Sequence, residues 1–362
     1  MLAAVYHGSK DLRVEEREIP SVAPDEMLLR VEAASICATD LRIFQGSHRK
    51  YSPGTVRVPG HEVVGRLAEV GRNVRGYHAG QRVFIAPNIG CGRCRSCRVG
   101  KNNLCPDYDA FGITIDGAFA EYMRITEPAI EQGNVIGVDS AVDPAGMALA
   151  EPFSCVLHGQ EAVSVGKGDV VLIQGAGPIG IMHLLLARRR DARRVLMSEQ
   201  STQRIATAYA LGADRVIDIG REELVDAVLS ESSGVGADVV IVATAAPAAL
   251  ENAVRAAAVG GRIIFFAGLP KEQPLIALDA NLVHYRELVV TGTTGCSTAD
   301  CRWAANMVAS GEIDLTPLIS GRFPLRDVIA GFQAARDRNG LKVVLEPLAH
   351  FEARKERGSD EE

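Results

Sequence analysis

Four cysteines stand within fifteen residues, spaced C-x2-C-x2-C-x7-C from Cys91 through Cys94 and Cys97 to Cys105. Four thiolates on one short loop suit a tetrahedral zinc ion, and such a site is structural because no coordination position stays open. The loop is polar and glycine-bearing, so metal ligation would supply its local fold. An iron–sulfur cluster and buried or disulfide-bonded cysteines are the alternatives, but the ferredoxin run has three residues before its last cysteine, where this chain has seven.

A second set of metal-ligand residue types is spread over three segments: ICATD, GHE and AEPFSC. Taken singly, each segment is weak evidence, because a lone cysteine is usually core and a lone histidine is usually a satisfied polar group. A catalytic zinc ion needs about three nitrogen, sulfur or oxygen ligands and one open position. The three segments together offer such a set, with these residues: Cys37, Thr39, Asp40, His61, Glu62 and Glu151.

A glycine-rich turn, GAGPIG, follows the apolar run VVLIQ and precedes a helical pattern. In this context G-x-G-x-x-G predicts a dinucleotide site, in which Gly175 allows the turn, Gly177 admits the pyrophosphate and Gly180 permits close packing of the helix. A glycine-rich loop without a ligand is the alternative. The predicted cofactor-binding residues of the turn are Gly175, Gly177, Pro178, Ile179 and Gly180.

Glu199 stands nineteen residues after Gly180, at the end of the next apolar run. The fingerprint places an acid there to accept hydrogen bonds from the ribose hydroxyls, and its charge disfavours the 2′-phosphate of NADP. We therefore expect NAD. Arg204 is close enough in sequence to assist an NADP phosphate, so NADP is the alternative.

These residues must be positioned by two domains, because 362 residues exceed the usual size of one. Short β-like runs up to about residue 126 indicate a β-rich first domain. From residue 170 to 291, apolar runs alternate with helical ones, as in βαβ units with a doubly wound parallel sheet. We predict an α/β protein with domains at 1–152 together with 295–347 and at 153–294, followed by a charged, frayed tail at 348–362.

The composition excludes several classes of partner. The net charge of −6 disfavours nucleic acid, since the one arginine cluster, from Arg188 to Arg194, reads as a solvated helix end. Apolar runs are too short for a membrane-spanning helix, and the N-terminal run is too short for a signal peptide. We therefore expect a cytoplasmic protein, where clustered cysteines favour metal over disulfides.

The segment GHEVVGRLAEVGRNV, residues 60–74, matches the pattern G-H-E-x-x-G-x5-G-x-x-V of zinc-containing alcohol dehydrogenases. ICATDL, the cysteine lobe, AEPFSC and GAGPIG also occur in that family's order. From about Ala3 to Pro347 the chain thus resembles the medium-chain dehydrogenase/reductase family, which implies a GroES-like catalytic domain and a Rossmann domain. Glu151 makes it similar to the sorbitol and threonine dehydrogenase branch, because classical alcohol dehydrogenases carry a cysteine there.

The resemblance implies that Cys37, His61 and a carboxylate bind a catalytic zinc ion, with Glu62 and Glu151 as the two candidates. It implies that Thr39 relays the released proton, although a plain turn residue is the alternative. Asp40 would orient the ring of His61 or merely cap the following helix. Each chain would then hold one catalytic and one structural zinc ion, the latter on Cys91, Cys94, Cys97 and Cys105.

The expected activity is NAD-dependent oxidation of a secondary alcohol, or reduction of a ketone, with a polyol or sugar alcohol as the small-molecule substrate. A threonine-type 3-hydroxy amino acid and a polyol phosphate remain open. A non-catalytic protein that binds zinc and dinucleotide is the alternative from another class, and the presence of both Cys37 and His61 argues against it. The family forms dimers or tetramers, so we expect a homo-oligomer paired through the edge strand LVVTG.

Overall fold

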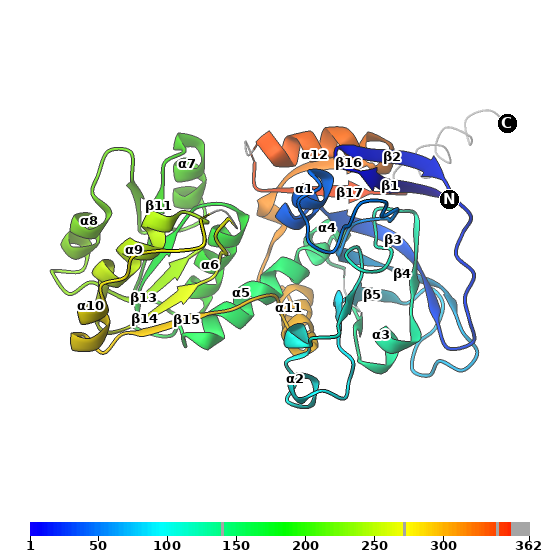
Figure 1. Ribbon diagram of the computed structural model, residues 1–362, viewed down its shortest axis with the longest axis horizontal. Helices are drawn as coiled ribbons and strands as arrows, with labels where there is room; N and C mark the ends of the chain where they lie inside the picture. The colour runs from blue at the N-terminus through cyan, green and yellow to red at the C-terminus, as the bar shows by residue number, and fades with distance from the viewer. Residues whose placement is uncertain (139–140, 271–272, 338–339, 349–362) are drawn as a thin grey trace. The chain divides into compact units, whose positions relative to one another are not determined.

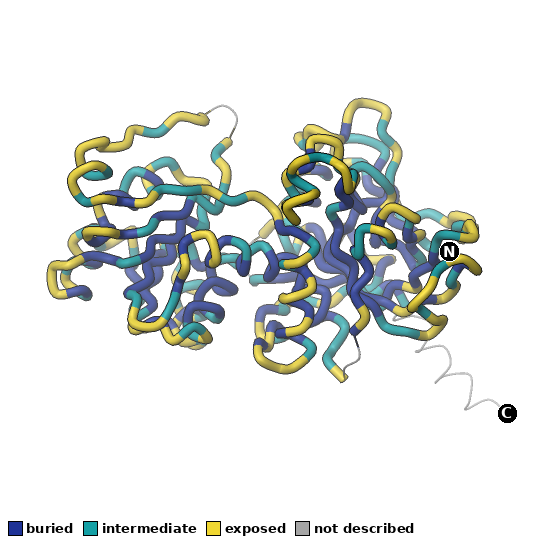
Figure 2. The backbone as a smooth tube through the Cα atoms, turned by 90° about the horizontal axis from the view of Figure 1, so that it is seen from below, coloured by how far each residue is buried: buried dark blue, intermediate teal, exposed yellow. Residues whose placement is uncertain are grey.

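The computed structural model describes residues 1–138, 141–270, 273–337 and 340–348, so the predicted tail lies almost wholly outside the described residues. The chain divides into two compact units, Met1–Ser154 with Cys296–Glu362, and Cys155–Gly295. Figure 2 shows that in each unit the central strands are buried while connecting segments are exposed. Within the described ranges, none of the helices has the length and hydropathy needed to cross a lipid bilayer.

The first unit is built on a seven-stranded sheet in the order β16-β17-β3-β4-β5-β9, with β8 also paired to β3. All its pairings are antiparallel except β16 with β17. The strands of this sheet are β3 (Met27–Ser35), β4 (Glu62–Val70), β5 (Arg82–Ile85), β8 (Tyr122–Ile125), β9 (Val135–Gly137), β16 (Ile319–Pro324) and β17 (Lys342–Glu346). Residues far apart in the sequence, such as those of β17 and β3, are therefore neighbours (Figure 1).

Shorter elements surround this sheet. Two small antiparallel sheets join β1 to β2 and β6 to β7. The bounds of these elements are β1 (Leu2–Gly8), β2 (Asp11–Glu16), α1 (Ala38–Phe44), β6 (Asn88–Ile89), α2 (Arg95–Arg98), η1 (Asn102–Leu104), β7 (Asp109–Ala110), α3 (Glu127–Glu131), α4 (Pro144–Ala148), α11 (Thr298–Ala309), η2 (Thr316–Leu318), η3 (Leu325–Asp327) and α12 (Val328–Asp337).

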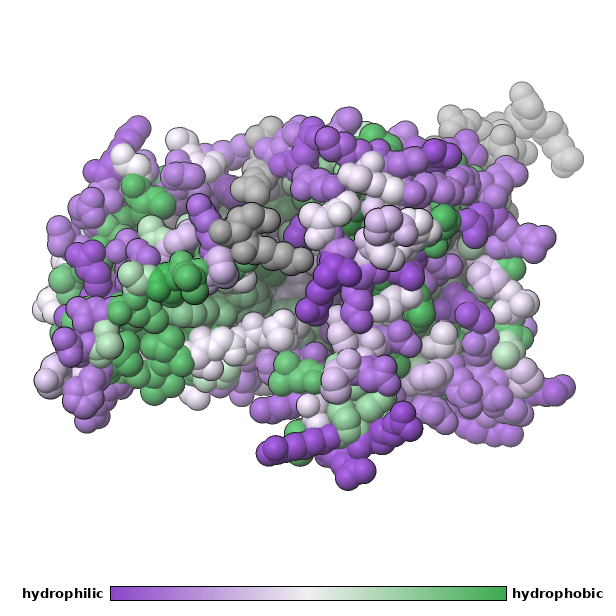
Figure 3. All heavy atoms as spheres, viewed as in Figure 1, coloured by the Kyte–Doolittle hydropathy of each residue, from purple (hydrophilic) through white to green (hydrophobic). Residues whose placement is uncertain are grey.

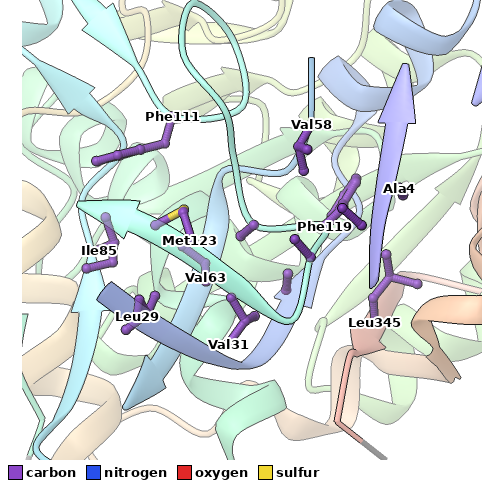
Figure 4. Packing of buried hydrophobic residues seen from close by; sticks show 14 of the residues in the cluster. Ala4, Leu29, Val31, Val58, Val63, Ile85, Phe111, Phe119, Met123 and Leu345 are labelled. Atoms are coloured by element: carbon purple, nitrogen blue, oxygen red, sulfur yellow. The ribbon is translucent and has the colours of Figure 1, made fainter. Parts of the chain in front are cut away.

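The core of the first unit joins apolar side chains of its strands. Figure 4 shows side chains from β3, β4, β5 and β8 in one core with Phe111 and Phe119, whose rings are both fully buried. Because successive side chains of a strand point to opposite faces, one face of each strand can enter this core. The labelled members are Ala4, Leu29, Val31, Val58, Val63, Ile85, Phe111, Phe119, Met123 and Leu345.

The second unit contains a six-stranded, wholly parallel sheet in the order β12-β11-β10-β13-β14-β15. All five residues of β10 (Val170–Gln174) are buried, as expected for a parallel strand covered on both faces. Helix α5 (Ala150–Ala162) runs from the first unit into the second. The other elements are α6 (Pro178–Arg189), β11 (Arg194–Glu199), α7 (Thr202–Ala210), β12 (Arg215–Asp218), α8 (Leu224–Glu231), β13 (Ala237–Val242), α9 (Pro247–Ala256), β14 (Ala257–Phe265), α10 (Ala280–Tyr285) and β15 (Val289–Gly292).

Candidate functional site

The pairing of β3 with β4 brings three ligand-type side chains together. Ser35 at the end of β3 lies opposite Glu62 at the start of β4. Cys37 follows β3 and His61 precedes β4, so both lie at this end of the strand pair. One ligand atom from each of Cys37, His61 and Glu62 lies within 4.8 Å of the others. A thiol, an imidazole and a carboxylate at this spacing are a donor set that zinc accepts.

Asp40 lies close to both of the first two residues: it caps the helix that follows Cys37, and its position beside His61 is compatible with the orienting role. Its Oδ2 accepts a hydrogen bond of 2.8 Å from the backbone N–H of Cys37, which caps the start of α1. Its Oδ1 lies 3.5 Å from Nδ1 of His61. With Nδ1 facing Asp40, Nε2 is the ring nitrogen left for a metal.

The electrostatics around His61 favour positive charge. Burial lowers the pKa of His61, but the nearby Asp40 carboxylate and the Cys37 sulfur outweigh it and raise that pKa well above its ordinary value. Nδ1 of His61, Oδ1 of Asp40 and Oε1 of Glu62 are buried and lack a hydrogen-bond partner among the described residues. Buried polar atoms are normally satisfied. Nδ1 of His61 and Oδ1 of Asp40 face each other, so Oε1 of Glu62 is the one of these atoms that a bound cation would satisfy. With Sγ of Cys37 and Nε2 of His61, this oxygen completes a donor set that fits a zinc ion.

Lys342 belongs to the same cluster and was missed by the sequence analysis. Its Nζ lies 2.5 Å from Oε2 of Glu62 and donates a 3.2 Å hydrogen bond to the carbonyl of Ile36. Burial lowers the pKa of Lys342, but the Glu62 carboxylate outweighs it and the pKa is raised. The available signal was a lysine beside the apolar run of LKVVLEP, because a lysine is almost never fully buried unless paired.

Glu151 is buried in the first turn of α5. Burial raises the pKa of Glu151 well above its ordinary value; Cys296, Glu62 and Cys37 add to the increase, while His61 opposes it. Glu151 therefore shares the electrostatic surroundings of the Cys37 group. Its Oε1 accepts a hydrogen bond from the Cys296 thiol, with a sulfur–oxygen distance of 3.8 Å.

Thr39 occupies the second position of α1, two residues after Cys37. Its side chain is half-buried, and its Oγ1 accepts a hydrogen bond from Nη2 of Arg42 at 3.1 Å. Arg42 lies one helical turn after Thr39, and nothing in its residue type or spacing predicted this contact.

The four cysteines of the lobe converge as a set that could hold a metal ion. Their sulfur atoms all lie within 4.8 Å of one another, and Cys94 and Cys105 are 3.8 Å apart. Four sulfurs at about 2.3 Å from one zinc ion in a tetrahedron stand about 3.8 Å apart, so this spacing fits zinc. None of the eight cysteines, all of which lie in the described ranges, forms a disulfide bond. Backbone N–H groups of Arg93 and Cys94 lower the pKa of Cys91 to about 6, whereas burial raises the pKa of Cys97 to about 12 and also raises that of Cys105. A bound metal ion would favour the thiolate form of all four.

The glycine turn lies at the carboxyl end of β10, in the second unit, and leads into α6 at Pro178. Gly175 has a positive φ of 104°, which favours glycine. A Cβ on Gly180 would stand 1.9 Å from the carbonyl oxygen of Gly175, whereas a Cβ on Gly177 would meet nothing closer than Arg204 Nη1 at 3.8 Å. Gly177 therefore leaves its side of the turn open, where a pyrophosphate can approach the start of α6, which also contains Ile179.

Glu199 at the end of β11 joins this turn. Its carboxylate accepts hydrogen bonds from the backbone N–H groups of Ala176, Gln200 and Ser201 at 3.1, 2.8 and 3.1 Å. Nη1 of Arg204 lies 4.0 Å from the same carboxylate, and Nε of Arg204 is buried without a hydrogen-bond partner among the described residues. Both predicted ribose-site residues thus lie beside the glycine turn.

Comparison with known proteins places this sequence among the zinc-containing dehydrogenases. Residues 23–132 match the alcohol dehydrogenase GroES-like domain, and residues 178–310 match the zinc-binding dehydrogenase domain. An L-threonine 3-dehydrogenase of Caldanaerobacter subterraneus is 34% identical over 351 residues, covering 94% of this chain and 97% of the relative. The chain belongs to the zinc-containing alcohol dehydrogenase family of medium-chain dehydrogenases. It is a zinc-dependent dehydrogenase with a GroES-like and a Rossmann domain, so the family and fold class predicted from the sequence are confirmed.

Solved structures of this family agree with that fold. A zinc-binding dehydrogenase of Sinorhizobium meliloti bound to NADP has a TM-score of 0.88 and 30% identity, covering 96% of this chain and 99% of that one. An alcohol dehydrogenase of Escherichia coli complexed with NADH has a TM-score of 0.86 and 26% identity, with the same coverage.

Proposed function

We propose that this dehydrogenase oxidises a secondary alcohol of a small polar substrate to the ketone, with NAD as hydride acceptor. The observation that carries the proposal is the convergence of ligand atoms from Cys37, His61 and Glu62 within 4.8 Å. Zinc bound there supplies a Lewis acid that lowers the pKa of the substrate hydroxyl. Cys37, His61 and one carboxylate, Glu62 or Glu151, would hold it.

The chain's own residues have three further tasks. Asp40 fixes the tautomer and orientation of His61 through its 3.5 Å contact with Nδ1. Thr39 receives the proton that leaves the substrate hydroxyl. Lys342 binds Oε2 of Glu62, which leaves Oε1 as the free oxygen of that carboxylate.

A sugar alcohol is our first candidate substrate. The loop between Cys37 and His61 carries polar side chains at His48, Arg49, Lys50 and Arg57, which suit a polyhydroxylated or anionic molecule. A 3-hydroxy amino acid is the second candidate, favoured by the similarity to an L-threonine 3-dehydrogenase. A panel of sorbitol, xylitol, galactitol phosphate and L-threonine, followed by NADH absorbance, separates these classes. A preference for long aliphatic alcohols would contradict both candidates.

We propose NAD rather than NADP as the cofactor because Glu199 stands where the fingerprint expects the acid that binds the ribose hydroxyls, and a carboxylate there would repel a phosphate. Arg204 opposes this preference, and relatives bind either dinucleotide. Ratios of kcat/KM for NAD and NADP test the assignment. Glu199→Ala should shift this ratio toward NADP, and Arg204→Ala should shift it toward NAD.

Metal analysis tests both zinc sites. Cys37→Ser should remove the catalytic zinc ion and the activity while the protein stays folded, because the other ligands remain in a folded sheet; its unfolding temperature should match that of wild type stripped of the same ion. Cys91→Ser should instead remove the structural ion and expose the cysteine lobe to proteolysis, because the lobe has little core of its own. Zinc contents of Glu62→Gln and Glu151→Gln identify the carboxylate ligand. Retention of both ions in Cys37→Ser would contradict the catalytic site.

We also propose a homo-oligomer, a dimer or tetramer, formed through the second unit. Strand β15 is the last strand of its sheet, and Val289 on it is 54% exposed. An exposed edge strand with apolar side chains is a template for pairing with a second copy.

A further inference from the structure

The orientation of the Thr39 hydroxyl depends on the side chain of Arg42. Thr39 is the second residue of α1, so no earlier turn of that helix offers a carbonyl for its hydroxyl. A helical threonine normally divides between rotamers according to such carbonyl bonds. Among the residues that the structure describes, Nη2 of Arg42 at 3.1 Å is the one hydrogen-bond partner of Oγ1. The rotamer of Thr39 is therefore fixed by a side chain and not by the backbone.

We propose that Arg42 is the positioning residue of the proton-release step, holding the Thr39 hydroxyl so that its hydrogen points away from α1. The inference rests on the proposed function. A guanidinium only donates, so Thr39 Oγ1 must accept from it and its own hydrogen is left for another acceptor. One lone pair of Oγ1 stays free to receive the proton of the substrate.

The reaction balances with these groups. The substrate carbinol loses a hydride from carbon to the nicotinamide of NAD and a proton from its hydroxyl, giving ketone, NADH and H⁺. As the substrate proton reaches Oγ1 of Thr39, the hydrogen already on that hydroxyl passes to water. Arg42 neither gains nor loses a proton, because a guanidinium stays charged at any pH used in an assay.

The charges around Thr39 suit the release of a proton. Arg42 is exposed, and the ion pairs of the described residues do not include it. Burial, Arg42 and Arg49 together lower the pKa of His48 to about 4, so that ring is neutral near pH 7. Cations from other elements lie beside α1 as well, since Lys10 and Arg336 line the same hollow as Leu41 and Phe44. Asp40 is the carboxylate next to Thr39 in sequence, and its oxygens face the Cys37 backbone N–H and Nδ1 of His61.

The test is a double-mutant cycle on the zinc-loaded enzyme with Arg42→Gln, Thr39→Val and the double variant. Misplacing the hydroxyl should lower kcat about 10-fold in Arg42→Gln, with KM values for alcohol and dinucleotide within about threefold of the wild type. In the Thr39→Val background the same change should have no further effect, because no hydroxyl remains to be positioned. Arg326→Gln, an exposed arginine of the same unit, is the control for loss of one charge and should match the wild type.

Chemical rescue separates a positioning role of Arg42 from a merely structural one, because added guanidinium would not restore the activity of a variant that had only lost structural support. Arg42→Lys should retain part of the activity, and added guanidinium at low concentration should raise kcat of Arg42→Ala but not of Thr39→Val. Zinc content and unfolding temperature should stay unchanged in every variant. Multiplicative effects in the cycle, or no rescue by guanidinium, would overturn this inference alone. A wild type that oxidises no alcohol would overturn the proposed function and, with it, the inference.

Discussion

Lys342 and Glu62 form a buried ion pair beside the proposed catalytic zinc. Their side chains are 6% and 0% exposed, and the Nζ–Oε2 distance is 2.5 Å. Removing one partner of such a pair costs about 3–5 kcal/mol, because an uncompensated charge stays buried. We therefore expect Lys342→Met to lower the free energy of unfolding by about that amount in urea titrations of the zinc-free protein.

The double variant Lys342→Met with Glu62→Gln is the matched control for this prediction. It removes both charges, so most of the lost stability should return. Equal stabilities of Lys342→Met and the wild type would mean that the pair contributes nothing. Zinc would reduce the penalty in Lys342→Met, because the ion offers Glu62 another positive partner.

His183 gives the second unit a pH-dependent stability. Its ring is fully buried between Gln160 and Phe266; burial, with a smaller contribution from Arg190, lowers its pKa to about 3. An unfolded histidine has a pKa near 6.5, so below that pH the unfolded chain binds a proton that the folded chain refuses. The stability from this group is thus fully present above pH 6.5 and lost as the pH falls toward 3.

We predict that the free energy of unfolding drops by about 2 kcal/mol between pH 7 and pH 5 because of His183 alone. His183→Leu should remove this share of the pH dependence, while replacement of the exposed His284 by glutamine should leave the wild-type slope. Denaturant unfolding at the two pH values measures the difference. An unchanged slope in His183→Leu would refute the assignment.

At the scale of elements, we expect two glycines of the turn between β10 and α6 to be needed for different reasons: Gly180 for the packing of the protein itself, and Gly177 for the space of the dinucleotide. A Cβ on Gly180 would collide with the Gly175 carbonyl at 1.9 Å, whereas a Cβ on Gly177 would meet no protein atom within 3.7 Å. Gly180→Ala should therefore lower the unfolding temperature by several degrees or prevent folding. Gly177→Ala should fold normally and bind NADH about 10-fold more weakly, because its methyl group fills the space of the pyrophosphate. Fluorescence titration with NADH checks the second outcome, and wild-type affinity would contradict it.

This turn also shows why some elements follow from the sequence. Some features depend only on residues that are close together in the sequence: the glycines of the turn, the cysteine lobe and the apolar runs. Their residue types and spacing within one short segment were enough to predict them. The pairing of Lys342 with Glu62 joins residues 280 positions apart. It depends on β17 lying next to β3 and β3 next to β4, an order that periodicity does not contain. Arg42 was missed because an exposed helical arginine is ordinary until its partner is known.

At the scale of the whole molecule, the two edges of the parallel sheet differ. Figure 3 shows hydrophobic residues gathered over the region of β15 and α10. Tyr285 on α10 is 77% exposed, Leu275 is 86% exposed and Val289 on β15 is 54% exposed. Apolar side chains beside an unpaired strand edge are costly in water, and contiguous exposed patches mark interaction sites. A second copy of the chain, pairing its own β15 edge, would cover them symmetrically.

We expect the wild type to sediment as a dimer or tetramer in analytical ultracentrifugation. Val289→Lys should sediment as a smaller species, because in the assembly each new lysine would be buried and would face the same lysine of the second copy across the two-fold axis. The matched control is Ile219→Lys, which follows β12 at the other edge of the same sheet, where the native side chain is 47% exposed. That variant should keep the wild-type assembly. If both lysine variants sediment like an oligomeric wild type, the β15 edge does not form the interface. If the wild type itself sediments as a monomer, no second copy covers the exposed patch.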